Sequence, residues 1–302
     1  MREEIQLVIM RSTFTGFFEV NDINSIEKEN SILLLGIPFE RIKATKGGSK
    51  KAPDALRKQS IEFSGISTDF NINNAEINCY DLGNIHPIKN KNYIIEIWKK
   101  IRENNSKLIV LGGDHSITYD TLVNAPWDDK TALVWIDSHA DLADEYPPGI
   151  FQSHGTVFTN LKKELELEKN QMLFIGGHGY TLTTTEFEKI QRGDTTNYIS
   201  TQKLLENKLK YLDEIKQFVS KFDKIYLSID SDAVDQVFIP TVATMEPFGI
   251  TPSILADLLN MLLPKAIYVD LVEIKFLRRN KLALNFGVGL IYRILEIWSS
   301  KA

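Results

Sequence analysis

The chain has 302 residues, a formal net charge of −5 and a single cysteine. An apolar fraction of 43% and a charged fraction of 25% are ordinary for a soluble globular protein, and the acidic balance argues against nucleic acid or an anionic membrane as a partner. Cys79 alone excludes an intramolecular disulfide, and with no secretory leader and no apolar stretch of membrane-spanning length we expect a cytoplasmic protein.

The predicted elements start after an N-terminal arm. Residues 1–30 mix aromatic and polar residues, and we interpret them as an arm that packs on the domain or on another subunit. Short apolar runs typical of buried strands lie at 31–36, 77–82, 108–112, 131–137, 171–175, 198–199, 224–229 and 266–272. Helical periodicity or helix start signals lie at 53–63, 90–104, 116–123, 157–168, 185–191, 201–221, 252–263 and 281–299.

Strands and helices alternate along the chain, which is typical of a parallel sheet covered by helices on both faces. No internal repeat, low-complexity tract or linker interrupts the alternation. We therefore expect an α/β protein with one domain over residues 1–302.

Three predicted strands run directly into acidic or imidazole side chains. Strand 131–137 ends in Asp-x-His-x-Asp, strand 108–112 leads into Gly-Gly-Asp-His, and strand 224–229 leads into Asp-x-Asp. The carboxyl ends of parallel strands line one edge of the sheet, where ligands bind. The candidate ligands are His115, Asp137, His139, Asp141, Asp230 and Asp232.

These side chains suit a metal centre. Buried carboxylates are costly unless they are paired, hydrogen-bonded or bound to a cation, and oxygen with imidazole ligands suits a divalent metal. The set is too large for one tetrahedral zinc and suits two metal ions that share bridging carboxylates. Each motif alone is more often a solvated loop or a turn, but all three behind apolar strands in one chain favour metal binding.

In order and spacing the motifs resemble those of the ureohydrolase family, the arginases and agmatinases, over about residues 31–295. The resemblance implies a three-layer α/β/α sandwich with a mainly parallel eight-stranded sheet, two Mn²⁺ ions per chain and a homotrimer or homohexamer. It also implies that one ion is held by His115, Asp137, Asp141 and Asp230. The other would be held by Asp137, His139, Asp230 and Asp232.

The resemblance also implies a reaction, the hydrolysis of a small cationic guanidino substrate. Metal binding lowers the pKa of water, so that a bridging hydroxide nucleophile persists near neutral pH. The predicted catalytic residues are His154 and Asp141. His154 lies in a Ser-His-Gly-Thr segment, 153–156, that resembles the family's proton shuttle and is closer to agmatinases than to arginases. Agmatine, hydrolysed to putrescine and urea, is therefore the predicted substrate.

Two further residues are predicted to bind the substrate. Glu273 ends the segment 270–273, which resembles the family's guanidinium-binding motif, and a carboxylate that ends an apolar strand needs a cation. The alternative for Glu273 is a salt bridge to a Lys or Arg. His178 stands near the expected mouth of the site, where the family often has Arg.

The sequence departs from the family at Gln236, in the stretch 240–247 and at 274–276, where Ile-Lys-Phe replaces Val-Asn-Pro. These departures leave the metal ligands alone and concern the shape of the substrate pocket. Arginine, guanidinobutyrate, guanidine and formiminoglutamate thus stay open as substrates. Two other functions also stay open: a deacetylase of the related fold with one metal, and a non-catalytic metal-binding relative.

Overall fold

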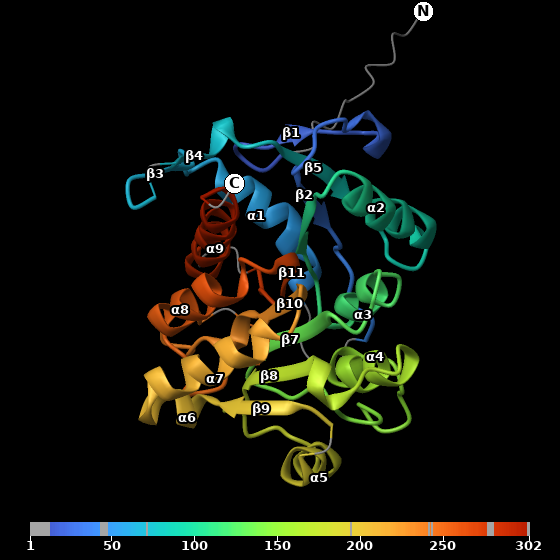
Figure 1. Ribbon diagram of the computed structural model, residues 1–302, viewed down its shortest axis with the longest axis vertical. Coiled ribbons are helices and arrows are strands. Elements are labelled where there is room, and N and C mark those ends of the chain that lie inside the picture. Colours follow the sequence, from blue (N-terminus) through green and yellow to red (C-terminus); the bar gives the residue numbers. More distant parts are fainter. Residues whose placement is uncertain are drawn as a thin grey trace, which may run out of the picture.

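The computed structural model describes residues 13–42, 48–70, 72–193, 195–240, 242, 244–276 and 281–300. Within these residues a nine-stranded parallel sheet forms the middle layer of the molecule (Figure 1). Its strands are β1 (Phe18–Glu19), β2 (Ile32–Gly36), β5 (Cys79–Asn84), β6 (Lys107–Leu111), β7 (Thr131–Asp137), β8 (Met172–Gly176), β9 (Asn197–Ser200), β10 (Lys224–Asp230) and β11 (Ala266–Val272). Their spatial order is β1-β5-β2-β6-β11-β10-β7-β8-β9.

All eight predicted strands are confirmed to within two residues at either end. The sheet nevertheless has nine strands and not the expected eight, because β1 pairs with β5 and adds a strand at the sheet edge. β1 belongs to the predicted N-terminal arm, and Phe14 and Phe17 beside it are buried. The described part of the arm, 13–30, thus packs on its own domain. An antiparallel pair, β3 (Ile66–Ser67) with β4 (Ile72–Asn73), lies apart from the sheet and has no predicted counterpart.

Helices cover both faces of the sheet (Figure 1). One layer contains α1 (Ala52–Ser60), α6 (Thr201–Glu206), α7 (Lys208–Ser220), α8 (Pro252–Leu262) and α9 (Leu282–Ser299). The other layer contains α2 (Lys91–Glu103), α3 (Ser116–Leu122) and α4 (Val157–Glu164). Helix α5 (Thr184–Arg192) lies beyond β9. The predicted three-layer α/β/α sandwich is confirmed.

The single helix predicted at 201–221 is wrong, because the chain breaks it at Asn207. Asn207 has a non-helical backbone, with φ −148 and ψ 74, which ends α6. Its side chain then accepts a hydrogen bond from Lys210 N and caps α7. Asparagine is favoured at such caps because its short side chain can hydrogen-bond to backbone N–H groups at the helix start. The presence of Asn207 in the sequence therefore indicates the break.

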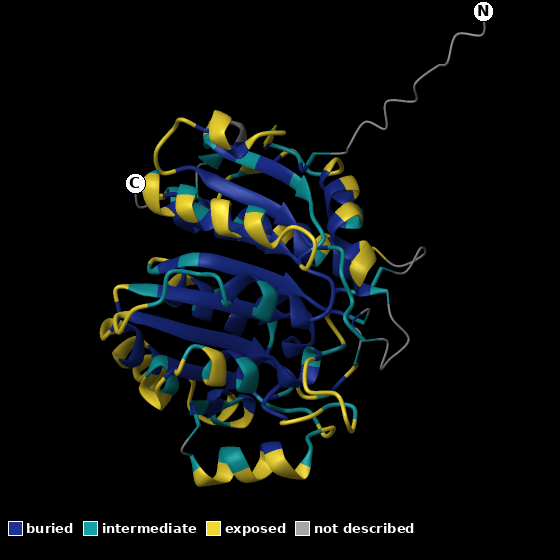
Figure 2. Cartoon of the chain, turned by 90° about the vertical axis from the view of Figure 1, so that its right-hand side faces the viewer, coloured by how far each residue is buried: buried dark blue, intermediate teal, exposed yellow. Residues whose placement is uncertain are grey.

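Alternate residues of each strand face the two helical layers. In β2, Ile32 and Leu34 belong to the core that contains α8 and α9, whereas Leu33 and Leu35 belong to the core that contains α2. Figure 2 shows the strands as buried between helices whose outer faces are exposed. Burial on both faces explains why these strands read as continuous apolar runs.

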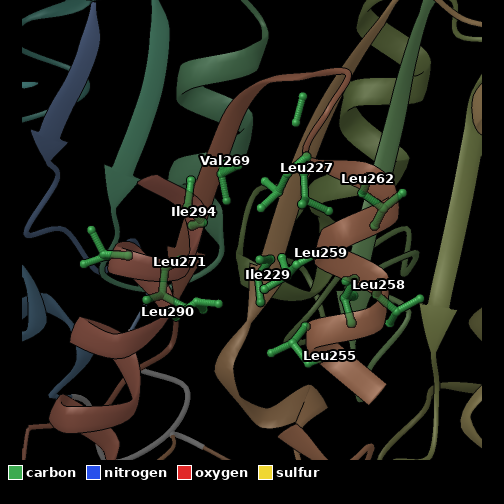
Figure 3. Close-up of a cluster of buried hydrophobic side chains, with 14 of the residues drawn as sticks. Leu227, Ile229, Leu255, Leu258, Leu259, Leu262, Val269, Leu271, Leu290 and Ile294 are labelled. Atoms are coloured by element: carbon green, nitrogen blue, oxygen red, sulfur yellow. The ribbon is translucent and has the colours of Figure 1, made fainter. Parts of the chain in front are cut away.

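The core under α8 and α9 is a packed aliphatic layer (Figure 3). Side chains of both helices lie against β10 and β11 in this layer. The residues shown are Leu227, Ile229, Leu255, Leu258, Leu259, Leu262, Val269, Leu271, Leu290 and Ile294. They fix the positions of β10 and β11, whose carboxyl ends carry predicted site residues.

Helix α9 corrects the expectation that no apolar stretch reaches membrane-spanning length. It has 18 residues with a mean hydropathy of 1.2, which is long and apolar enough by composition. However, 67% of it is buried inside the protein, where it packs on α1 and the sheet. The apolar surface of α9 is therefore that of a core helix.

Candidate metal centre

The carboxyl ends of β7 and β10 bring two predicted ligands together. In the parallel register Ile136 pairs with Ile229, so Asp137 and Asp230 come next on adjacent strands. Asp232 follows in a short 3-10 turn, 231–233. The shared edge of the sheet thus gathers carboxylates from two separate motifs, as the sequence predicts.

His115 reaches this edge from the turn between β6 and α3. A Cβ at Gly113 would lie 1.9 Å from the carbonyl oxygen of Phe39, so this close approach requires glycine. The adjacent Asp114 is committed to the turn, where one carboxylate oxygen accepts hydrogen bonds from the backbone and hydroxyl of Ser116. The Gly-Gly-Asp-His motif therefore builds a tight turn that presents only its histidine to the cluster.

The His115 imidazole faces three carboxylates. Its Nδ1 atom lies 3.0 Å from Asp137 Oδ2, 3.0 Å from Asp141 Oδ2 and 3.4 Å from Asp230 Oδ2. All four residues are buried, and the ligand atoms of His115, Asp137 and Asp141 lie within 4.8 Å of one another. The residues predicted to hold the first ion therefore converge.

A second group forms around His139. The Nδ1 atom of His139 lies 3.2 Å from Asp232 Oδ2 and 3.6 Å from Asp137 Oδ1. Their ligand atoms also lie within 4.8 Å of one another. Asp137 thus offers Oδ2 to the His115 group and Oδ1 to the His139 group, which is the position of a bridging carboxylate.

Unpaired buried atoms show that this cluster fits cations. His115 Nδ1 and Asp137 Oδ2 are buried without a hydrogen-bond partner. Leaving one such group unsatisfied costs about 1–3 kcal/mol. The four aspartates of the cluster carry four negative charges when ionised, which two divalent cations would balance. Carboxylate oxygens with imidazole nitrogens are also a donor set that divalent metals accept.

Burial and crowded negative charge raise the pKa of two of the aspartates. Burial, and then the charge of Asp137, raises the pKa of Asp141 to about 7. Burial, and then the charges of Asp232 and Asp137, raises the pKa of Asp230 well above its usual range. A cation between these carboxylates would offset that repulsion and favour their ionised forms.

A chain of hydrogen bonds behind His115 fixes its orientation. His115 Nε2 lies 2.8 Å from Ser228 Oγ, and Ser228 donates to Asp270 Oδ1 at 2.6 Å. The other Asp270 oxygen accepts hydrogen bonds from Thr118 and Tyr268. Since the Ser228 proton points to Asp270, its oxygen accepts the Nε2 proton, and the Nδ1 lone pair faces the cluster.

No motif in the sequence predicts a role in the site for Ser228 or Asp270. Both lie inside buried apolar strands, and each is 0% exposed. A polar residue in such a strand requires a hydrogen-bond partner. The sequence therefore indicates that Ser228 and Asp270 form buried hydrogen bonds, but it does not indicate with which residues.

Two site residues adopt a strained backbone. Asp141 has φ 50 and Glu273 has φ 60, the left-handed region that other residues than glycine rarely occupy. Such conformations cost on the order of 1–3 kcal/mol each and cluster at functional sites. Hydrogen bonds hold both residues, from Phe158 N to the Asp141 carbonyl and from Glu273 N to the Gly113 carbonyl.

Two cavities open beside the cluster. The smaller has a volume of about 40 Å³ and has Glu273 and Lys275 on its wall. The larger has a volume of about 190 Å³ and has Tyr146 and Leu182 on its wall. His154 borders both cavities. The position of His154 is therefore suited to its predicted proton-transfer role.

The surroundings of His154 keep it neutral. Burial is the main cause that lowers the pKa of His154 to about 4, and the neighbouring imidazoles of His115 and His139 lower it further. The ring of Tyr146 lies edge-on to it, with 5.4 Å between ring centroids. A neutral imidazole at pH 7 can accept a proton during a reaction and then release it.

Glu273 lies at the wall of the smaller cavity without a cationic partner. Its Oε1 atom accepts a hydrogen bond from His115 N at 2.9 Å. In the part of the chain that the structure describes, no ion pair joins it to Lys, Arg or His within 4.0 Å, so the alternative of a structural salt bridge finds no support there. Burial, and then the charge of Asp114, raises the Glu273 pKa well above its usual range.

His178 lies near the cluster but borders neither cavity. Its Nδ1 atom is 3.4 Å from Thr201 Oγ1, and its Nε2 atom is buried without a partner. The contact of His178 with substrate therefore stays a prediction. Glu246, which no sequence motif predicts, also reaches the cluster: its Oε1 atom lies 3.7 Å from His139 Nε2 and accepts a hydrogen bond from Thr181.

Comparison with known proteins agrees with this arrangement. An agmatinase of Photorhabdus laumondii is 28% identical over 257 residues, 80% of this chain and 78% of that protein. A formimidoylglutamase of Halalkalibacterium halodurans is 27% identical over 225 residues, 72% of this chain and 70% of that protein. The crystal structure of the agmatine ureohydrolase of Thermoplasma volcanium has the same fold, with a TM-score of 0.82 and 23% identity over 99% of this chain and 98% of that chain.

The family match covers most of the described fold and all of the site. Residues 30–294 match the Arginase family, a span that runs from the start of β2 into α9 and includes every member of the cluster. This chain belongs to the arginase family, the binuclear-metal ureohydrolases.

Proposed function

We propose that the protein hydrolyses a C–N bond of a guanidino or formimino group with two divalent cations, of which Mn²⁺ is the expected metal. The observation that carries the proposal concerns two buried atoms in a cluster of four carboxylates, His115 Nδ1 and Asp137 Oδ2. They lie 3.0 Å apart, and neither has a hydrogen-bond partner. One ion would be held by His115, Asp137, Asp141 and Asp230, and the other by Asp137, His139, Asp230 and Asp232. Bound cations would supply a water-derived nucleophile at neutral pH.

Glu273 would bind the positively charged end of the substrate. Its free carboxylate oxygen borders the smaller cavity beside His115. A guanidinium would bring a planar set of N–H donors and the positive charge that this buried carboxylate lacks among its described neighbours. The role of Glu273 is therefore to orient the amidine group against the cluster.

His154 would move the proton that the leaving amine requires. Because its pKa is lowered to about 4, the imidazole rests in the neutral form and accepts a proton from the reacting water. It borders both cavities and can release that proton to the departing nitrogen. Tyr146 packs edge-on against the ring and limits its rotation.

The substrate is proposed at the level of the shared amidine group. Agmatine follows from the Ser-His-Gly-Thr segment, and the similarity to an agmatinase supports it. A formimidoylglutamase matches at nearly the same identity, so the charge at the far end of the substrate is a separate question. The cytoplasmic location and the homotrimer or homohexamer stay predictions.

The direct test uses protein loaded with Mn²⁺ and measures urea released from agmatine, arginine, guanidinobutyrate and guanidine. Formamide release from formiminoglutamate covers the formimino class. We expect turnover of at least one compound, its loss with a chelator and its return with Mn²⁺. No turnover of any compound by protein that contains metal would reject the proposal and favour the non-catalytic relative. Metal analysis should give two ions per chain, whereas one zinc would favour the deacetylase alternative.

A further inference from the structure

We infer that Lys275 selects a substrate whose end remote from the amidine carries a carboxylate. The inference rests on the proposed function and concerns the same site. Lys275 stands where the family pattern has asparagine, and it follows Glu273 by two residues. Both side chains border the smaller cavity beside the cluster. The wall therefore carries one carboxylate for the amidine and one ammonium for a group of opposite charge.

The ammonium of Lys275 has no counter-ion among the residues that the structure describes. No carboxylate in those ranges lies within 4.0 Å of its Nζ atom. The side chain runs beside Gly48, where an added Cβ would lie 3.3 Å from Lys275 Cγ. It is half-buried at this wall, so an anion that enters the cavity would gain an ion pair with little competition.

The nearby carboxylates are already committed. Glu40 Oε1 accepts hydrogen bonds from Gly48 N, Ser49 Oγ and Lys50 N. Asp114 accepts hydrogen bonds within its own turn and from Arg41 N. The other Glu40 oxygen, Oε2, lies 4.0 Å from Lys50 Nζ, so the ion pair that the structure describes for Glu40 is with Lys50 and not with Lys275.

The larger cavity offers no site for an ammonium either. Apart from residues of the metal cluster, Glu186 is the one acidic residue on its described wall. Both oxygens of Glu186 are used, one by Leu142 N and the other by the backbone and hydroxyl of Thr183. The undescribed residues next in sequence to the cavity walls, 43–47, 241, 243 and 277–280, include no Asp or Glu.

These charges oppose a diamine-derived substrate such as agmatine. Its distal ammonium would meet the Lys275 cation, and the wall carboxylates outside the metal cluster, apart from Glu273, already accept hydrogen bonds from the chain. A guanidino acid of the same length would place its carboxylate where the uncompensated cation lies. Like charges brought together in a partly desolvated site are strongly unfavourable, whereas opposite charges there favour binding. The structure thus favours a guanidino acid over a guanidino amine.

The test compares three substrates that share a butyl chain: 5-guanidinovalerate with a carboxylate, agmatine with an ammonium, and neutral butylguanidine. We expect kcat/KM for 5-guanidinovalerate to exceed that for agmatine by about tenfold or more. In Lys275→Met this ratio should fall toward one, mainly through KM. Lys275→Glu should invert it, and Lys275→Arg should keep it. A wild-type preference for agmatine, or an unchanged ratio in Lys275→Met, would overturn the inference.

Equilibrium binding separates this inference from the proposed function. Calorimetric titration of the three compounds into the Mn²⁺-loaded protein reports selectivity without turnover. Tighter binding of 5-guanidinovalerate that Lys275→Met abolishes supports the inference even when no compound is hydrolysed, whereas equal affinities reject it. Lys221→Met is the matched control, because Lys221 is exposed and precedes β10 at the opposite edge of the sheet. Its selectivity should equal that of the wild type.

Discussion

His115 Nε2 lies 2.8 Å from Ser228 Oγ, and this contact decides which imidazole nitrogen faces the metal cluster. Ser228 Oγ donates to Asp270 at 2.6 Å and accepts from His115. Replacing Ser228 with alanine should therefore release the ring and lower the affinity for the first metal by about 10–100-fold. Calorimetric titration of metal-free protein with Mn²⁺ measures this affinity.

Ser231→Ala provides the matched control for Ser228→Ala. Ser231 is also buried, but its hydroxyl has no hydrogen-bond partner in the described structure. Its replacement should leave the Mn²⁺ affinity within about threefold of the wild type, because no ligand depends on it. Equal affinities for both variants would mean that Ser228 does not position His115.

A second prediction concerns the bridging role of Asp230. Asp230→Asn should lower metal content and hydrolysis together, because an amide is a poorer ligand than a carboxylate and removes one of the four negative charges. Metal analysis of the dialysed protein and urea release measure the two effects. Asp235→Asn is the control in the same segment, since Asp235 instead accepts from Val237 N and Gly249 N. Retained activity in Asp230→Asn would refute the bridging assignment.

The sequence predicts the elements that bring the site together better than the contacts within it. β7 and β10 are continuous apolar runs ending in aspartate, so both their type and the convergence of Asp137 with Asp230 follow from the parallel sheet. The approach of His115 to Ser228 joins residues 113 positions apart, and no local pattern encodes such a distance. Short elements are equally hard to predict, because β1 has two residues and depends on its pairing with β5.

Wall residues are the other part that the sequence leaves open. His178 comes from a glycine-rich loop after β8 at the expected edge, yet its ring contacts Thr201, and it lines neither of the two cavities beside the cluster. Lys275 looks like an ordinary exposed lysine in the sequence, yet the turn at Glu273 brings it to the smaller cavity. Side-chain direction in loops depends on packing across the whole fold, which periodicity does not report.

A third prediction concerns the core that supports β10 and β11. Leu259 on α8 is 1% exposed and packs in the aliphatic layer of Figure 3. Leu259→Ala should lower the free energy of unfolding by about 2–5 kcal/mol, because it removes buried methyl groups and leaves a cavity. Urea denaturation of metal-free protein measures the change. Leu209→Ala, at a side chain 74% exposed, should stay within about 0.5 kcal/mol of the wild type.

The lowered pKa of His154 predicts how folding stability depends on pH. Its folded-state pKa is about 4, below the value of about 6.5 that it has in an unfolded chain. The unfolded state therefore binds more protons than the folded state between these two pH values. The free energy of unfolding is thus undiminished by His154 above pH ~6.5, and it decreases as the pH falls toward ~4. His154→Gln should remove up to about 3 kcal/mol of this loss. Urea denaturation at both pH values with a chelator measures it, and parallel pH curves for the two proteins would contradict it.

The last prediction separates substrate binding from metal binding. Glu273 borders the cavity but belongs to neither ligand group, so Glu273→Gln should keep both metals while it loses the charge that attracts an amidine. A hydrogen bond to a charged group is worth about 1.5–3 kcal/mol, so kcat/KM should fall about 10–100-fold. Glu206→Gln, at an exposed position on α6, is the matched control and should behave as the wild type. Loss of metal from Glu273→Gln would show that Glu273 belongs to the metal site. An unchanged kcat/KM would show that Glu273 does not bind the guanidinium of the substrate.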